Sequence, residues 1–541
     1  MDKEQKRQLK SRNREEKKEA KLAKKQAEQS LRAEKVILRE VAKQEKLVKK
    51  EEETLKNEKK IIKQEEKSIK NEEKTIKKET KLEKKQEKQD SRGKKAEEKA
   101  KANAEKEEIK RELAKSNKKV FDWYKLDNAA KIFPAVSSVK DTNVFRLGVR
   151  MKSQIDPEIL QSALVQTLER FPAFRVKLKR GVFWYFFEFN EKKPIVFEDD
   201  DCPCALIVPE NLNDYLFKTS YFQNRIYIDV FHSLSDGGGA IEFLKTLTLC
   251  YLQMSGENVE TGGLVKNPYA KSSLSEHENS YVKYYDKHDK KVDMPPKAYK
   301  MTGTQYEYGF SVINAHTSAS EFLKLAKSKN CTITQYVVTT LLLAVYNIDF
   351  KGNPHNFNLP IQVLVPVNLR KMFPSETLRN FSSIVHGALQ NGDNLDFDSV
   401  LNGVKESFEK SLTPDFMKTR FSSHTQIEKN LAIRIAPRVV KDIIMKAVYE
   451  TSGTANITTN FSNLGVVKLP ESMEKFVSGF EFQSSVSKRG VTFCSAVTYR
   501  DDLCFSFTRR IKEARLEKEF FRMLQKDGLE FCLEENEIWS R

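Results

Sequence analysis

Cysteine is scarce in this 541-residue sequence and follows no regular spacing. The seven cysteines include no CxxC pair and stand at positions 202, 204, 250, 331, 494, 504 and 532. A disulfide framework typically shows an even, regularly spaced set, and a zinc ribbon needs paired cysteines. The composition therefore disfavours both classes and favours a protein of a reducing compartment.

Long apolar segments are also missing. The start of the sequence has no apolar run of the signal-peptide kind, so we expect no secretory signal. The longest apolar run, 336–348, is shorter than the ~20 residues that span a bilayer. We therefore expect a cytoplasmic protein, either free in solution or peripheral to a membrane.

Three common catalytic signatures are absent: GxSxG, GxxxxGK[ST] and GxGxxG. Their absence disfavours α/β-type serine hydrolases, P-loop nucleotide hydrolases and dinucleotide oxidoreductases. The histidines at 277, 288, 316, 355, 386 and 424 are isolated, with no metal-ligand spacing around them. We predict no metal site.

Charge is divided unevenly along the chain. Residues 1–119 carry 42 Lys and Arg against 27 Asp and Glu, a net charge of +15, which leaves +3 of the total +18 for the rest. Within this arm, 51–85 repeats every seven residues, but only one apolar column is filled, by Leu55, Ile62, Ile69 and Ile76. A stable coiled coil fills two columns.

We therefore predict that 1–119 is a charged helical arm, either a solvated single helix or a weak coiled coil. Two interpretations of its role stay open. The arm either has no specific partner, or it self-associates or contacts anionic membrane surfaces or nucleic acid loosely. No aromatic residues alternate with its lysines, so we expect no specific nucleic-acid partner.

From residue 120 the pattern becomes α/β. In the first half, 120–305, the pattern predicts a helix that begins after Asp156-Pro157 and hairpins over 174–189 and 215–231. A buried helix over 240–252 and a long crossover over 255–305 follow. The second half, 306–541, predicts strands over 306–313, 359–370, 456–465, 480–485, 491–499 and 503–511, and helices over 318–330, 332–347 and 513–527. Two α/β subdomains with mixed sheets follow.

One stretch, "FHSLSDGGG" at 231–239, combines groups that can carry chemistry. The preceding strand would hold the backbone of His232, so that its imidazole projects from the strand end. Gly237–Gly239 permit a tight turn and close backbone approach. Asp236 would begin the next helix, where free amides favour a carboxylate. The structural alternative is a buried histidine above a plain helix cap.

The stretch resembles the HxxxDG motif of the chloramphenicol acetyltransferase-like acyltransferase superfamily, in its alcohol acetyltransferase and condensation-domain branch. Three further segments are similar to that superfamily in the expected order: "ALVQTLERFPAFR" at 163–175, "VPVNLRKMFP" at 365–374 and "NFSNLG" at 460–465. The resemblance covers about 120–541. Phe231 replaces the first of two histidines found in many members, and the DFGWG motif of the plant branch is absent, which disfavours plant-type substrates.

The resemblance implies a tunnel between the two subdomains and direct acyl transfer from a thioester, acyl-CoA or an acyl carrier protein, to an acceptor hydroxyl. It implies that His232 is the general base. Asp236 and Arg370 would form an ion pair beside Gly237 that pins the histidine loop, and Asn463 and Ser462 are the candidate oxyanion donors. It implies no tightly bound cofactor, with acyl-CoA as co-substrate and a small or lipid-like alcohol as acceptor.

Two alternatives remain at this point. One is a carrier-protein-dependent condensation enzyme that forms amides, and the other is a protein that keeps the fold as a binding scaffold without turnover. The sequence names neither the acyl chain nor the acceptor.

Overall fold

The computed structural model describes residues 123–199, 202–289, 295–307, 309–351, 358–392, 395–429, 431–488 and 490–535. All of these belong to one compact unit of the chain, Leu113–Arg541. The arm predicted over 1–119, with its weak coiled coil, lies outside the described residues.

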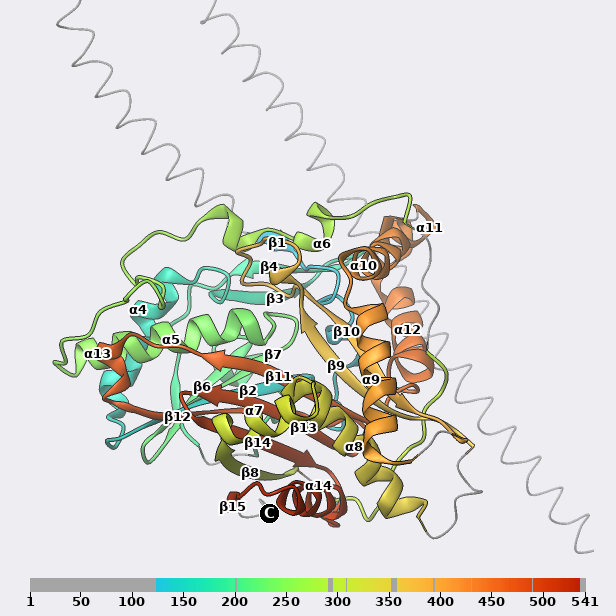
Figure 1. The fold of residues 1–541 in the computed structure, drawn as a ribbon. Coiled ribbons are helices and arrows are strands. Elements are labelled where there is room, and N and C mark those ends of the chain that lie inside the picture. Colours follow the sequence, from blue (N-terminus) through green and yellow to red (C-terminus); the bar gives the residue numbers. More distant parts are fainter. Residues whose placement is uncertain are drawn as a thin grey trace, which may run out of the picture. The chain divides into compact units, whose positions relative to one another are not determined.

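The first of two large sheets has five strands in the order β12-β2-β7-β6-β5 (Figure 1). Its strands are β2 (Val144–Met151), β5 (Val196–Glu198), β6 (Phe217–Phe222), β7 (Arg225–Phe231) and β12 (Val477–Ser484). Helix α5 (Gly237–Met254) packs on α4 (Pro157–Arg170) and on β2. This sheet and its two helices share one hydrophobic core.

Local sequence signals in this half are confirmed. The β6–β7 hairpin turns at Gln223, whose φ of 51° is the left-handed conformation that a tight hairpin turn needs. Asp156 caps α4 by accepting hydrogen bonds from the backbone N–H groups of Glu158 and Ile159, with Pro157 in the first turn. The second predicted hairpin forms β3 (Val176–Arg180) and β4 (Tyr185–Phe189) in a small three-stranded sheet with β1 (Trp123–Lys125).

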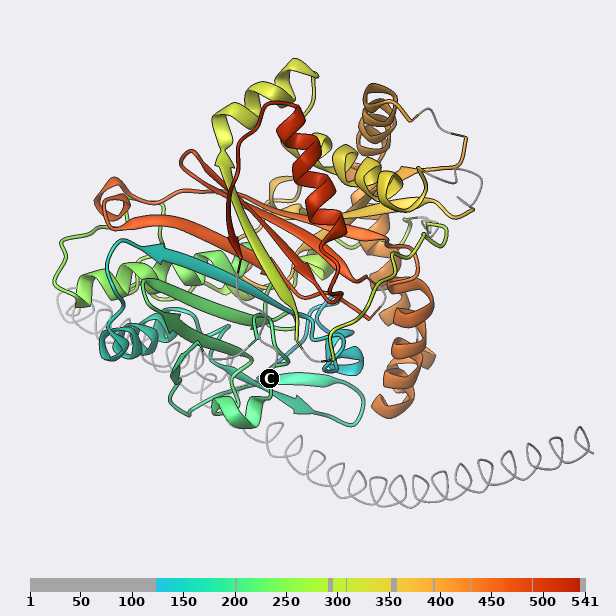
Figure 2. The same ribbon diagram turned by 90° about the horizontal axis from the view of Figure 1, so that it is seen from below.

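The second large sheet has seven strands in the order β10-β9-β11-β13-β14-β8-β15. These are β8 (Ser311–Ser318), β9 (Ile361–Asn368), β10 (Ser382–Leu389), β11 (Thr459–Val467), β13 (Thr492–Tyr499), β14 (Asp502–Arg509) and β15 (Cys532–Glu535). Helices α8 (Ile333–Asp349) and α14 (Arg515–Lys526) pack together within a second hydrophobic core, and Figure 2 shows α14 lying across this sheet. The pairs of β11 with β9 and with β13 are parallel, so the sheet is mixed, as predicted.

The remaining helices surround these layers. They are α3 (Phe133–Val136), α6 (Ser280–Lys283), α7 (Ala319–Ser328), α9 (Phe397–Ser411), α10 (Pro414–Lys429), α11 (Leu431–Ile435), α12 (Arg438–Val448) and α13 (Glu471–Glu474). The strand predicted over 306–313 is displaced: β8 runs from Ser311 to Ser318, and Gln305 before it makes only an isolated bridge to Ile511. Helices α9 to α12 were not foreseen from the sequence.

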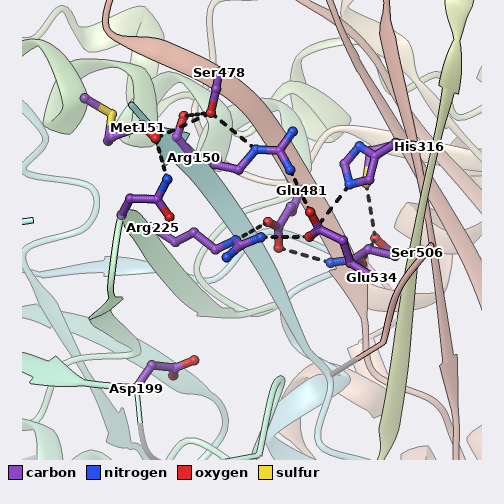
Figure 3. A network of polar contacts seen from close by, with 12 residues as sticks. Arg150, Met151, Asp199, Arg225, His316, Ser478, Glu481, Ser506 and Glu534 are labelled. Atoms are coloured by element: carbon purple, nitrogen blue, oxygen red, sulfur yellow. Dashed lines mark hydrogen bonds and ion pairs between the residues drawn. The ribbon is translucent and has the colours of Figure 1, made fainter. Parts of the chain in front are cut away.

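One strand departs from the predicted division at residue 305. β12 follows β11 in the chain, yet it pairs antiparallel with β2 and so completes the sheet of the first half. Figure 3 shows the polar network that joins the two sheets next to it. There Arg225 donates to Glu481 on β12 at 2.8 Å and to Glu534 on β15 at 2.7 Å. The two halves therefore interlock through this strand and are not separated at one point in the chain.

Within the described part of the chain, no single helix has both the length and the apolar composition of a membrane span, and α7 with α8 meets that test only as a pair bent by 79°.

Candidate active site

His232 lies directly after strand β7, where the chain leaves the first sheet. Its backbone N–H donates to the carbonyl of Asn143 at 2.9 Å, which fixes the start of the loop. The imidazole is half-buried and stacks on Phe133, with ring centroids 4.8 Å apart, and the edge of Phe145 packs on it at 5.3 Å. The ring is therefore held between two aromatic side chains.

The orientation of the imidazole is set by Asn380. The side-chain amide of Asn380 donates to the carbonyl of His232 at 3.0 Å and to the carboxyl of Asp127 at 3.3 Å. These two acceptors determine which end of the amide is nitrogen, so its Oδ1 must be the atom 3.0 Å from His232 Nδ1. An oxygen acceptor there requires a proton on Nδ1, which leaves Nε2 with its lone pair available.

Neither Asn380 nor Asp127 was identified from the sequence. Asp127 is fully buried, and its carboxyl also accepts from the backbone N–H of Ala130 at 2.8 Å. Burial raises the pKa of this carboxyl, against the opposing effect of Arg379 at 3.7 Å. Asn380 stands in no recognisable motif, and 148 residues separate it from His232. Only the folded chain brings these groups together.

Asp236 and Arg370 form the ion pair that the sequence analysis predicted. Both carboxylate oxygens of Asp236 accept from the guanidinium at 2.9 Å. The same oxygens accept from the backbone N–H groups of Gly239 and Phe381 at 3.0 and 2.8 Å. Burial by itself would raise the pKa of Asp236, but Arg370 and the two amides hold it below its ordinary value. The carboxyl therefore stays ionised and fully hydrogen-bonded.

Arg370 extends this pair toward the histidine. Its guanidinium also donates to the carbonyls of Thr377 and Arg379, at 2.9 and 2.6 Å. Asn380 follows directly in the chain and precedes Phe381, whose N–H binds Asp236. The ion pair thus fixes the residues on either side of Asn380, which are Arg379 and Phe381. Asn380 in turn fixes the imidazole of His232.

The three glycines act differently from the prediction. Gly237–Gly239 do not form the tight turn but begin helix α5, with Asp236 as its N-cap, and the turn itself lies over 232–234. The expected close approach is present. A Cβ on Gly239 would lie 2.0 Å from the carbonyl oxygen of Leu378, so only glycine fits beneath this loop.

A cavity of about 620 Å³ opens at the histidine. All six residues singled out from the sequence line it: His232, Asp236, Gly237, Arg370, Ser462 and Asn463. Its walls come from both sheets, because Phe145 and Phe482 belong to the first and Pro366 to the second. The cavity thus lies where the resemblance implied a tunnel.

The two candidate oxyanion donors differ in their surroundings. Asn463 is engaged within its own region, since its amide donates to Thr334 Oγ1 at 3.2 Å and its Oδ1 accepts from the N–H of Gly465 at 2.9 Å. Ser462 precedes it on β11 and is half-exposed in the cavity wall. The buried Oδ1 of Asn460, which also lines the cavity, has no hydrogen-bond partner in the described part of the structure.

No group of three or more His, Cys, Asp or Glu side chains among the described residues could hold a metal ion.

Comparisons with known proteins match just under half of the chain to one family model. Residues 266–527 match the family model described as alcohol acetyltransferase, a range that includes Arg370, Asn380 and Ser462 but not His232. No curated protein matches the chain significantly.

Among solved structures, the chain is similar to polyketide synthase associated protein 5 from Mycobacterium tuberculosis, with a TM-score of 0.51 and 14% identity over 74% of this chain and 96% of that one. It is also similar to F. graminearum TRI101 complexed with coenzyme A and T-2 mycotoxin, with a TM-score of 0.49 and 10% identity over 76% of this chain and 99% of that one. Residues 266–527 are thus similar to the alcohol acetyltransferase family, and polyketide synthase associated protein 5 shares the fold of the chain.

Proposed function

We propose that this protein is an O-acyltransferase that moves an acyl group directly from a thioester to an acceptor hydroxyl, with His232 as the general base. The observation that carries this proposal is the contact of His232 Nδ1 with Asn380 Oδ1, because it assigns the proton to Nδ1 and leaves Nε2 as the base. The imidazole is part of the cavity wall, where a substrate can reach that nitrogen.

The reaction has two proton transfers and one acyl transfer. His232 Nε2 takes the proton of the acceptor hydroxyl as the oxygen attacks the thioester carbon, which produces a tetrahedral oxyanion. The carbon–sulfur bond then breaks, the ester is released, and the imidazolium returns its proton to the departing thiolate. Asn380 stabilises the imidazolium through the bond to Nδ1–H, as an oriented acceptor does in other histidine bases.

Ser462 is the better candidate for the oxyanion donor. A hydroxyl can turn toward the developing charge, whereas the amide of Asn463 already donates to Thr334. For the donor we propose acyl-CoA, and for the acceptor a small or lipid-like alcohol whose hydroxyl reaches the cavity of about 620 Å³ beside the acyl group.

The test is product formation with acetyl-CoA and longer acyl-CoAs against a panel of alcohols and amines, followed by mass spectrometry. We expect esters from the wild-type protein and a loss of about 10²–10⁴-fold in rate for His232→Ala. The matched control is His288→Ala, at an exposed histidine far along the chain, which should keep the full rate.

Three results would contradict the proposal. Undiminished turnover by His232→Ala would remove the histidine from the chemistry. Amide products in place of esters would favour a condensation enzyme. Turnover with acyl carrier protein thioesters and none with acyl-CoA would change the proposed donor.

A further inference from the structure

Helix α12 is oriented opposite to an ordinary surface helix. Its polar side chains Arg438, Lys441 and Asp442 face the protein, and Lys441 is only 4% exposed. Its apolar side chains face solvent. A surface helix normally buries its apolar stripe and exposes its charges, so this arrangement needs a physical reason.

The inward polar face contacts the β3–β4 hairpin through Lys441, Arg438 and Asp442. Lys441 Nζ donates to the carbonyl of Phe183 at 2.9 Å and lies 3.8 Å from the ring centroid of Trp184. Arg438 pairs with Asp442 at 2.7 Å, and Asp442 accepts from the hydroxyl of Tyr185 at 2.9 Å. These contacts fix the rotation of the helix about its axis, and that rotation exposes the apolar face.

Each turn of the helix contributes exposed apolar side chains to this face. Its members, with their exposed fractions, are Val439 (38%), Val440 (45%), Ile443 (66%), Ile444 (56%) and Val448 (51%), with Ile435 (64%) before the helix and Val182 and Phe183 (39% each) on the adjoining hairpin turn. We call these eight residues the α12 patch. Figure 1 shows α12 at the edge of the molecule beside α10 and α11.

Exposed basic residues border the patch. Arg434 precedes α12 and Lys446 lies within it, while Arg180 ends strand β3 just before Val182, next to Lys179, which pairs with Glu188 at 3.8 Å. The acidic residue of the helix, Asp442, is neutralised by Arg438 on the opposite side. Glu450 lies in the turn that follows the helix. The border is therefore predominantly positive.

We propose that the α12 patch docks on an anionic lipid surface, with its isoleucines and valines in the interface and its basic border against the headgroups. Amphipathic helices with exposed Ile, Val and Phe and flanking Lys or Arg bind membranes in this way. The positive charge of the border favours an anionic lipid surface over two other possible occupants, the arm 1–119 and a second copy of the chain. The arm 1–119 carries +15 and a second copy would present the same basic border, so both would be repelled.

The patch lies beside the candidate active site. Tyr449, directly after α12, lines the cavity, and α12 packs on α3, whose Phe133 stacks on His232. Docking through α12 would therefore bring the cavity close to the lipid surface. The inference about the acceptor rests on the proposed function: it identifies the acceptor as a lipid-soluble alcohol.

The first test measures binding of the full chain to vesicles of phosphatidylcholine with phosphatidylglycerol. We expect Ile443→Asp to weaken binding by about tenfold, since it removes an inserted apolar side chain and adds a negative charge. The matched control is Leu323→Asp on α7, at an exposed apolar residue outside the patch, which should bind as the wild type does. Equal binding by both variants, or no vesicle binding by the wild type, would overturn the proposal.

The second test measures lipid contact at the α12 patch itself, so that lipid binding by the arm does not affect the result. The full chain carries Cys532→Ser, to remove the exposed thiol, and a fluorescent label on Ile444→Cys or, as the control, on Leu323→Cys. Brominated lipids should quench the label at 444 and not at 323. Equal quenching at both positions would overturn the proposal, as would a dimer in solution that Ile443→Asp dissociates.

The acceptor assignment has its own readout. Ile443→Asp should keep the wild-type rate on a water-soluble alcohol and lose rate on a long-chain alcohol held in vesicles. Equal loss on both would overturn the assignment. A protein without any turnover would contradict the proposed function alone, and the vesicle tests would still decide the docking.

Discussion

Asp236 and Arg370 are joined by two hydrogen bonds of 2.9 Å, although 134 residues of chain separate them. One residue caps helix α5 in the first half of the fold, and the other follows strand β9 in the second. Their side chains are only 8% and 15% exposed. The pair therefore connects the histidine loop to the loop that carries Asn380, away from bulk water.

The first prediction concerns this ion pair. Asp236→Asn keeps the shape of the side chain but leaves the guanidinium without its counter-charge. We expect the free energy of unfolding to fall by about 3–5 kcal/mol, together with the rate of acyl transfer. Urea unfolding measures the first effect. Glu406→Gln, which breaks the exposed pair with Lys410, should leave the free energy of unfolding nearly unchanged, because solvent screens this pair. Full stability with no activity would show that Asp236 acts in the chemistry and not in the architecture.

The second prediction concerns Asn380 as a positioning residue. Asn380→Leu keeps the volume and removes the acceptor at Nδ1, so both tautomers of His232 become populated. We expect kcat to fall by about 10- to 100-fold with little change in KM, because the substrate cavity is not altered. Nitrogen-15 spectra of histidine-labelled protein should show the change in tautomer. An unchanged tautomer with reduced kcat would contradict this role.

The third prediction concerns Gly239. A methyl group there would overlap the carbonyl oxygen of Leu378 and lie 2.3 Å from the hydroxyl of Ser235, so Gly239→Ala must displace the loop before Asn380. We expect a cost of about 1–3 kcal/mol in stability and a loss of activity. Gly403→Ala is the control, because Gly403 lies in α9 with open space around its Cβ position and should gain up to about 1 kcal/mol. Equal stability of the two variants would contradict the close approach.

The fourth prediction concerns acid stability and His386 on β10. Burial, with a smaller effect of Arg420, lowers the pKa of His386 from 6.5 to about 4, and both ring nitrogens lack partners in the described structure. As the pH falls below 6.5 the unfolded chain takes up a proton that the folded chain does not accept until about pH 4. Folding stability should therefore decrease between these values, by up to about 3 kcal/mol from this group.

The measurement is urea unfolding at several pH values for the wild type and His386→Phe. The variant should show a shallower loss of stability from pH 6.5 to pH 4. An identical pH dependence would mean that His386 does not contribute to acid sensitivity.

The sequence alone determined the elements whose signals are local. The β6–β7 hairpin follows from alternating apolar residues on either side of Gln223-Asn224, and α8 begins at a capping box between Thr332 and Gln335. The resemblance of the segments 231–239 and 365–374 to one acyltransferase superfamily likewise implied that Asp236 and Arg370 are partners. In each case the residues that make the structure are close in the chain or belong to a motif of known spacing.

Only the tertiary structure decided the rest, because it depends on contacts between residues far apart in the chain. β12 reads as an ordinary strand of the second half, and its place beside β2 depends on non-local pairing that no local pattern encodes. Asn380 is an isolated amide in the sequence and defines the tautomer of His232 only once Arg370 and Asp236 hold its loop. The outward apolar face of α12 also arises this way, because the hairpin at Trp184 binds its polar side.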